Sequence, residues 1–316
     1  MTRVAVCSRS FSRHPVLRQE LQDRHPDVTF NDEGRVLAGE ELIDFLQGHE
    51  KAITALETLD AGVFAAVPEL KTVSKYGVGC DSIDLDAMAE AGVSLGWTGG
   101  TNRRSVSELV IALAVQLLRH LLQARSEVLD GVWRQQVGRQ LSERTVGIVG
   151  CGHVGKDLSV LLRAFGCKVL AHDILDFPNF YTQNEIEPVG LEELLRQSDV
   201  VTLHLPLDDT TRNILSAERL ALMKPDAVLI NTARGGLVDE AALKGALKDG
   251  RLLGAAFDVF ATEPPEDQEL LNLPNFIVSP HIGGSAEESI LAMGRAAIEG
   301  LEKNQTPERG VFPDNY

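Results

Sequence analysis

The chain has 316 residues, of which 44% are hydrophobic and 24% charged, so it has the composition of a folded protein with room for two cores. Asp and Glu outnumber Lys and Arg by 46 to 30, giving a formal net charge of −16. This excess argues against a general nucleic-acid or anionic-membrane surface, because phosphate binding depends on positive patches.

The cysteine pattern indicates reduced thiols. Four cysteines occur, and none lies in a C-x-x-C pair or in a His/Cys cluster with zinc-ligand spacing: Cys7, Cys80, Cys151 and Cys167. The chain has no apolar run of 18 residues, and its first seven residues lack the apolar segment of a signal peptide. We therefore expect a cytoplasmic protein without a membrane span or a metal site.

The first third of the chain alternates short apolar runs with helical patterns such as 15–23 and 40–47. The expected strands are Val4–Cys7, Val28–Phe30, Lys51–Thr54 and Thr72–Lys75. This alternation predicts a parallel sheet covered by helices on both faces.

A glycine-rich break at Gly96–Thr101 precedes the longest helical pattern, Ser105–Leu129, which Asn102 or Ser105 could cap. Leu118 and Leu122 widen its apolar stripe beyond what one packing face needs. Part of this helix is therefore either a subunit interface or a core helix covered on two sides.

A second strand–helix series follows and ends in a helical pattern at 286–303. Its expected strands are Thr145–Val149, Lys168–His172, Asp199–His204, Ala227–Asn231, Leu252–Asp258 and Phe276–Val278. Two such series predict two doubly wound domains with the second inserted in the first. We expect residues 1–98 and 284–316 to form one domain and residues 99–283 the other.

The second series opens with the sequence VGIVGCGHVG, in which Gly150, Gly152 and Gly155 form a G-x-G-x-x-G pattern between a strand and a helix. The glycines permit a tight turn, a close approach of backbone to a pyrophosphate, and close helix–strand packing. Asp173 follows the next strand, where an acid accepts hydrogen bonds from the adenosine ribose and repels a 2′-phosphate. The pattern predicts a dinucleotide site that prefers NAD to NADP.

Three later strands end in polar segments that carry Arg234, Asp258 with Glu263, and His281. Because open α/β sheets bind ligands at the carboxyl ends of their strands, these side chains are expected at one edge. Histidine can donate or accept a proton near neutral pH, and a neighbouring carboxylate orients the imidazole and favours its charged form. The planar guanidinium group of arginine can form two parallel hydrogen bonds to a substrate carboxylate. Considered alone, each of these residues could also be a turn or surface residue without a catalytic role.

These motifs together resemble the D-isomer-specific 2-hydroxyacid dehydrogenases. The resemblance rests on KYGVGCDSIDL (75–85), TGGTNRRSVSE (98–108), GIVGCGHVGK (147–156), NTARGGLVDE (231–240), FDVFATEPP (257–265) and SPHIGG (279–284). It implies a Rossmann-like cofactor domain inserted into a smaller flavodoxin-like substrate domain, and usually a homodimer. It also implies hydride transfer between NAD(H) and C2 of a small 2-hydroxy or 2-keto acid.

The resemblance also implies residue roles. Arg234 binds the substrate carboxylate and polarises the carbonyl, His281 is the general acid and base, and Glu263 is its partner. The implied cofactor contacts are Gly150, Gly152, His153, Val154, Gly155, Asp173, His204, Pro206, Thr211, Thr232, Ala233, Asp258 and Gly283. The implied substrate contacts are Lys75, Gly77, Val78, Gly79, Asn102, Arg103, Arg104, Arg234 and His281.

Positive and polar residues suggest an anionic tail on the substrate, as in 3-phosphoglycerate. Lys75, Arg103 and Arg104 are its expected partners, and the segment Ser8–Ser10 is a further candidate. The chain departs from the family at Gly99-Gly100, usually a Pro-Gly pair, and at the bulky Trp97. Because of these two departures, the usual substrates of the family cannot be assigned to this chain from the motifs.

Two alternatives remain open on the sequence alone. A phosphite-type dehydrogenase shares the Arg/Glu/His set, whereas formate dehydrogenases carry Gln at the position of Glu263. A non-catalytic NAD-sensing protein like the family's corepressors is the second alternative, and the complete set of reacting groups argues against it.

Overall fold

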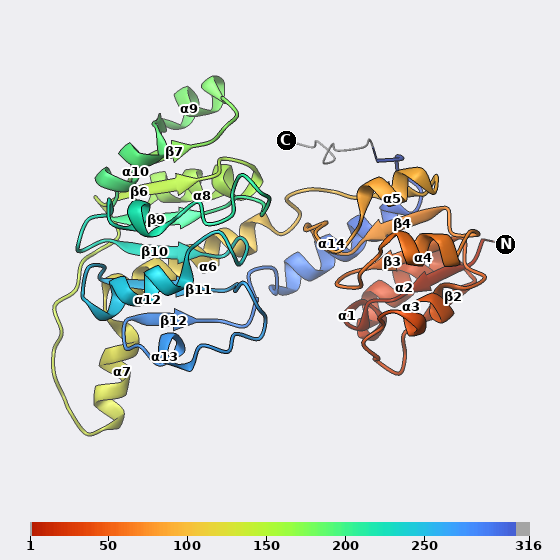
Figure 1. The fold of residues 1–316 in the computed structure, drawn as a ribbon, viewed down its shortest axis with the longest axis horizontal. Helices are drawn as coiled ribbons and strands as arrows, with labels where there is room; N and C mark the ends of the chain where they lie inside the picture. Colours follow the sequence, from red (N-terminus) through yellow and green to blue (C-terminus); the bar gives the residue numbers. More distant parts are fainter. Residues whose placement is uncertain (1, 308–316) are drawn as a thin grey trace. The chain divides into compact units, whose positions relative to one another are not determined.

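The computed structural model describes residues 2–307, which form two compact units (Figure 1). The first comprises the chain up to Asn102 and from Ala286 onward, and the second comprises Arg103–Ser285. The division lies slightly later in the chain than the expected boundaries at 98/99 and 283/284, because the segment that follows the last strand of the first unit runs on to Asn102.

The first unit contains a parallel five-stranded sheet of order β2-β1-β3-β4-β5. Its strands are β1 (Val4–Val6), β2 (Val28–Phe30), β3 (Lys51–Thr54), β4 (Thr72–Lys75) and β5 (Ser94–Gly96). Its helices are α1 (Arg9–Arg13), α2 (Pro15–Arg24), α3 (Glu40–Leu46), α4 (Ala61–Ala66), α5 (Leu85–Glu90) and α14 (Glu287–Gly300). This order is that of flavodoxin-like sheets, as expected.

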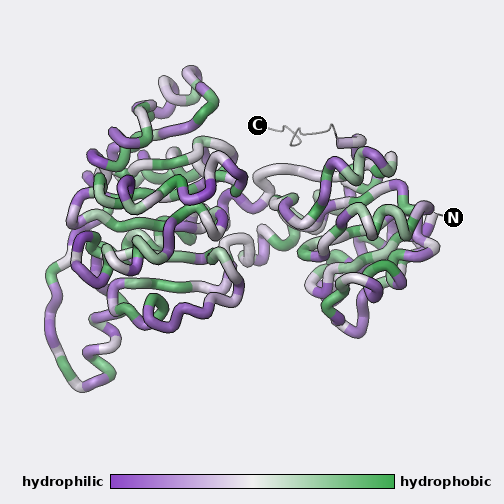
Figure 2. The backbone as a smooth tube through the Cα atoms, in the orientation of Figure 1, coloured by the Kyte–Doolittle hydropathy of each residue, from purple (hydrophilic) through white to green (hydrophobic). Residues whose placement is uncertain are grey.

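Alternate residues of β1 show why both faces of this sheet are covered. Val4 and Val6 are buried with residues of α1, α2 and α14, whereas Ala5 is buried with residues of α3, α4 and α5. Successive side chains of a strand point to opposite faces, so a continuous apolar strand requires a helical layer on each side. Figure 2 shows the hydrophobic residues concentrated in such strands.

The second unit contains a parallel seven-stranded sheet of order β12-β11-β10-β9-β6-β7-β8. Its strands are β6 (Thr145–Val149), β7 (Lys168–His172), β8 (Glu187–Pro188), β9 (Val200–Leu203), β10 (Val228–Asn231), β11 (Gly254–Phe257) and β12 (Phe276–Val278). Its helices are α6 (Arg103–Leu118), α7 (Leu121–Leu129), α8 (His153–Ala164), α9 (Pro178–Asn184), α10 (Leu191–Gln197), α11 (Ala217–Leu220), α12 (Glu240–Lys248) and α13 (Gln268–Leu271). Counted from β6, the first six strands follow the Rossmann order, which confirms the expected fold class.

The prediction of one continuous helix over Ser105–Leu129 is wrong. The helix breaks at His120, which has a left-handed backbone (φ 53°), and the axes of α6 and α7 differ by 59°. The buried stripe of α6 ends at Leu118, whereas α7 buries no residue, so packing no longer holds the chain on the sheet. Ser105 lies inside α6 and caps nothing; its hydroxyl donates to the Gly283 carbonyl at 2.6 Å.

The segment after the break extends from the second unit as an arm, defined here as residues 121–137 (Figure 1). Its apolar side chains are exposed, including Leu129 (67%), Trp133 (85%) and Val137 (93%). Within residues 2–307, no single helix is long and apolar enough to cross a membrane; α6 and α7 meet that length and composition only as a bent pair.

Candidate active site

The glycine turn after β6 has the close contacts that its sequence predicts. Gly150 has φ 99°, and a Cβ atom there would lie 2.5 Å from the His204 carbonyl oxygen. A Cβ atom at Gly155 would lie 2.1 Å from the Gly150 carbonyl oxygen. Helix α8 begins directly after Gly152, and the N-terminus of a helix favours an anion such as a pyrophosphate.

Asp173 is anchored beside this turn. Its carboxylate accepts the N–H groups of Cys151 (2.6 Å) and Leu175 (2.9 Å). A carboxylate has about four acceptor positions, so these two bonds leave capacity for ribose hydroxyls. The glycine turn, the helix terminus and the acid thus fit the adenosine and pyrophosphate portion of NAD.

The carboxyl ends of β10, β11 and β12 are neighbours because these strands are adjacent in the sheet. At the end of β10, the Asn231 side chain donates to the Arg234 carbonyl (2.8 Å) and accepts the Ala233 N–H (3.1 Å). The glycine after Arg234 lies against the segment after β11, since a Cβ atom at Gly235 would come within 1.9 Å of the Phe260 carbonyl. Asn231 therefore fixes the turn that carries Arg234, a role that the sequence did not predict.

The structure brings His281 and Glu263 together. The His281 Nδ1 atom lies 2.9 Å from Glu263 Oε2, while Glu263 Oε1 accepts the Phe260 N–H at 3.1 Å. His281 also has a left-handed backbone with φ 54°, which costs a non-glycine residue energy and often marks a functional site. The Glu263 carboxylate is held by its own loop and can orient the imidazole.

Asp258 maintains the loop that carries His281. Its backbone carbonyl accepts the His281 N–H at 2.9 Å. Its side chain accepts the Ile282 and Gly283 N–H groups (2.8 and 2.7 Å) and the Ser279 hydroxyl (2.5 Å). These bonds stabilise the unusual backbone of His281 from the neighbouring strand.

Two further residues, His204 and Thr232, were predicted to contact the cofactor. Burial lowers the pKa of His204 to about 3, and its Nε2 atom contacts the Thr202 hydroxyl at 3.0 Å. His204 is therefore neutral at physiological pH and unsuited to proton donation. The buried Thr232 hydroxyl has no hydrogen-bond partner within residues 2–307, as expected where a polar ligand group completes the site.

The loop after β9 carries two more predicted cofactor residues, Pro206 and Thr211. The Thr211 hydroxyl donates to the Pro206 carbonyl at 2.8 Å, which closes this loop on itself. His153 and Val154 are the first two residues of α8. No group of three or more His, Cys, Asp or Glu side chains in the part of the chain that the structure describes is arranged to hold a metal ion.

Comparison with known proteins identifies the family. Residues 111–283 match the model of the D-isomer specific 2-hydroxyacid dehydrogenase, NAD binding domain. A glycerate dehydrogenase of Methylorubrum extorquens is 38% identical over 274 residues, covering 83% of this chain and 85% of that protein. The chain belongs to the D-isomer-specific 2-hydroxyacid dehydrogenase family.

Other members of the family differ in length and substrate. A D-3-phosphoglycerate dehydrogenase of Methanocaldococcus jannaschii is 35% identical over 277 residues, covering 84% of this chain and 52% of that protein. The chain thus spans about half the length of such relatives. The structure of a D-lactate dehydrogenase from Aquifex aeolicus, complexed with NAD and lactic acid, has a TM-score of 0.83 at 26% identity and covers 94% of this chain and 93% of its own.

The first unit of this dehydrogenase-family chain carries the Gly77–Gly79 loop. Lys75 is buried at its base, where its ammonium group donates to the Ala55 carbonyl and to the Ser82 hydroxyl (3.1 Å). Trp97 Nε1 donates to the Val78 carbonyl at 2.9 Å. Since C=O and N–H of one peptide point in opposite directions, this bond turns the Gly79 N–H away from Trp97. This role of Trp97 could not be predicted from its neighbours in the sequence, because its partner lies 19 residues away.

The residues predicted to bind a substrate tail are not gathered within one unit. Lys75 and Asn102 belong to the first unit, and Arg103 and Arg104 to the second. Arg104 forms a two-point ion pair with Asp157 of α8 (2.8 and 3.0 Å). Burial of Lys75 and pairing of Arg104 make both weaker candidates for an anionic tail than the sequence suggested.

Proposed function

We propose that this protein is an NAD-dependent dehydrogenase that transfers a hydride between NAD(H) and C2 of a small 2-hydroxy or 2-keto acid. The observation that carries the proposal is the His281–Glu263 pair, 2.9 Å apart, on the sheet edge that also carries Arg234. Membership of the family supports the same reaction.

The proposed chemistry divides between cofactor and protein. NADH, when bound, supplies the hydride that reduces C2. The His281 imidazolium donates the proton that the carbonyl oxygen then needs, and in the reverse direction the neutral imidazole accepts it. Glu263 stabilises the imidazolium, and the Arg234 guanidinium binds the substrate carboxylate.

We further propose that the cofactor is NAD(H). Asp173 lies where the adenosine ribose is expected, and a 2′-phosphate there would face a carboxylate. The segment 174–177 that follows has no lysine or arginine to compensate.

A panel of acids tests the activity. Purified protein is mixed with NADH and glyoxylate, hydroxypyruvate, pyruvate or a keto acid with an anionic tail, and the absorbance of NADH is followed. We expect turnover of at least one acid, and loss of that turnover in Arg234→Gln. Absence of turnover with every acid would refute the proposal, and NAD reduction by phosphite instead would indicate the phosphite-type alternative.

We also propose a cytoplasmic homodimer. The arm exposes apolar side chains over α7 and the following loop, a surface that a second copy can cover by a two-fold contact. The four buried cysteines are all free thiols, which suits a reducing compartment.

A further inference from the structure

Lys156 is a positive charge beside the glycine turn that the proposed reaction does not use. It is the fourth residue of α8, and its backbone N–H donates to the Gly152 carbonyl at 2.9 Å, so it completes the first turn of this helix. Its ammonium nitrogen lies 3.5 Å from the centroid of the Phe177 ring. Within residues 2–307 no acid pairs with this ammonium group, whereas Lys168 at the start of β7 pairs with Glu187. The face of an aromatic ring therefore holds the charge of Lys156.

The Phe177 ring is held in place by the core of the second unit. Phe177 is the N-cap residue of α9, and its ring meets the Tyr181 ring edge-on with centroids 6.1 Å apart. Tyr181 is buried in the same hydrophobic core as Cys151, and Phe177 packs against that core. Of the two partners in the contact, the long lysine side chain is therefore the one that can move.

Cys151 lies close both to this lysine and to Asp173. The Asp173 carboxylate accepts the Cys151 N–H at 2.6 Å. Burial, with the nearby Asp173 carboxylate, raises the pKa of the Cys151 thiol to about 11, and the Lys156 ammonium group acts in the opposite direction. Two opposite charges thus lie near the same side chain, although no ion pair joins them in the described part of the chain.

These two charges have opposite effects on an adenosine that carries a 2′-phosphate. Asp173 lies where the proposed function places the adenosine ribose, and Phe177 follows it by four residues in the same segment. A carboxylate repels a phosphate at this position, whereas an ammonium group attracts it. The 2′-hydroxyl of NADH carries no charge, so Lys156 should matter little for that cofactor.

The contact with Phe177 limits the attraction that Lys156 can exert. Lys156 is half-buried, and a cation–π contact at such a site corresponds to about a two- to fivefold factor in affinity. A 2′-phosphate must draw the ammonium group away from the ring before the two can pair. Part of the energy of the new ion pair is then used to break the old contact.

We infer that Lys156 is a second specificity residue of the cofactor site, which attracts a 2′-phosphate against the repulsion of Asp173 and is restrained by Phe177. The inference rests on the proposed NAD(H) site. It adds a cation from α8 to a site whose own segment, residues 174–177, has no lysine or arginine. The preference for NADH over NADPH then depends on two opposing charges and can be changed in either direction.

The test measures the Kd of NADH and of NADPH through the fluorescence of the bound nicotinamide, with the full chain and without a keto acid. All variants are made in Asp173→Ala, because removal of the repelling carboxylate brings NADPH binding into a measurable range. Adding Lys156→Gln should weaken NADPH binding by about fivefold or more, because the phosphate loses a charged hydrogen bond. Adding Phe177→Leu should strengthen NADPH binding by about two- to fivefold, because it releases the ammonium group. NADH binding should change little in both.

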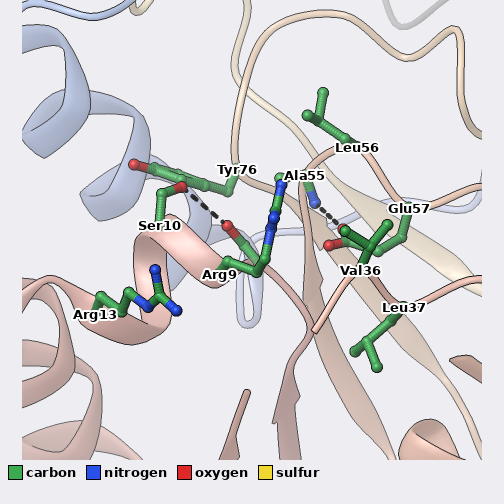
Figure 3. A pocket seen from close by; sticks show the side chains of 10 residues that line it. Arg9, Ser10, Arg13, Val36, Leu37, Ala55, Leu56, Glu57 and Tyr76 are labelled. Carbon is green, nitrogen blue, oxygen red and sulfur yellow. Dashed lines mark hydrogen bonds between the residues drawn. The ribbon is translucent and has the colours of Figure 1, made fainter. Parts of the chain in front are cut away.

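Three variants provide the controls. Lys156→Arg keeps a cation that binds phosphate and should keep NADPH binding. Lys168→Gln removes the same charge from the end of β7 opposite to Asp173 and should change neither Kd. Arg13 lines a pocket of about 410 Å³ in the first unit, shown in Figure 3, so Arg13→Gln removes a positive charge outside the dinucleotide-binding unit and should also change neither Kd.

The binding data separate this inference from the proposed reaction. Equal weakening of NADH and NADPH in Lys156→Gln would overturn the inference, because it would place the lysine on the pyrophosphate that both cofactors carry. Unchanged NADPH binding in Lys156→Gln would overturn it as well. A protein that binds NADH but reduces no keto acid would refute the proposed reaction, and the NADPH series would still decide the role of Lys156.

Discussion

Neutralising Glu263 should slow the proposed reaction. The variant Glu263→Gln keeps the shape of the side chain and one acceptor oxygen, but it removes the negative charge 2.9 Å from the imidazole. Its single oxygen also cannot make both contacts of the carboxylate, with the Phe260 N–H and with His281. Reduction takes a proton from the His281 imidazolium, so the variant loses the stabilisation that the carboxylate gives to this cation.

The size of the effect follows from the exposure of the pair. The His281 and Glu263 side chains are 52% and 39% exposed, so water screens the attraction. Two unit charges about 4 Å apart attract by about 1 kcal/mol in water and by about 4 kcal/mol at an effective dielectric constant of 20. A half-exposed pair lies near the lower value, and roughly 1 kcal/mol corresponds to about a fivefold change in rate. We therefore expect kcat/KM for reduction to fall about fivefold.

The assay compares kcat/KM for keto-acid reduction by wild type and Glu263→Gln at one pH. Glu266→Gln, which changes an exposed acid on the same loop, is the matched control and should leave kcat/KM unchanged. His281→Ala should lower kcat/KM by about a hundredfold or more while NADH affinity stays nearly unchanged. An unchanged kcat/KM in Glu263→Gln would remove Glu263 from this role, and a nearly fully active His281→Ala would end the proposed mechanism.

Four other predictions concern separate parts of the chain. Wild type should prefer NADH to NADPH by at least about a hundredfold, and Asp173→Ala should narrow this ratio; equal kcat/KM for both cofactors in wild type would contradict it. Trp97→Phe keeps the ring but loses the bond to the Gly77–Gly79 loop, so KM for the keto acid should rise about three- to tenfold without a change in KM for NADH. Trp133→Glu should convert a dimer into a monomer in sedimentation experiments, and a monomeric wild type would refute the proposed interface. The pKa of His204 is lowered to about 3 in the folded protein, so as pH falls below about 6.5 this histidine is protonated first in the unfolded chain. The free energy of unfolding should therefore decrease by up to about 1.4 kcal/mol for each pH unit of acidification. His204→Asn should remove this component in chemical denaturation without cofactor, and equal slopes for the two proteins would refute it.

The buried strands could be predicted because each is an apolar run between turn signals. β2, β3 and β4 have the predicted bounds, and β6 and β7 do as well. The misses were β5 and β8, which have only three and two residues. β5 ends in a glycine and β8 is exposed throughout, so neither presents an apolar run. Edge position alone is not the cause, because the edge strands β2 and β12 were predicted with their observed bounds.

The break between α6 and α7 could not be predicted from helical periodicity. The apolar spacing continues through Leu121 and Leu122, but these side chains are 53% and 42% exposed. Periodicity records which residues seek an apolar surface and not which surface covers them. The end of the intramolecular core at Leu118 is a tertiary property that the local pattern does not contain.

The positions of site residues could be predicted where these residues directly follow a strand. Asp173, Arg234 and His281 each lie just beyond a strand, and parallel strands bring their carboxyl ends to one edge whatever the loops do. The positive charges of Lys75 and Arg104 were evident from the sequence, but the role of a charged side chain depends on its interaction partner. Their partners, the Ala55 carbonyl and Asp157, are distant in sequence, so composition alone could not show that both were already engaged.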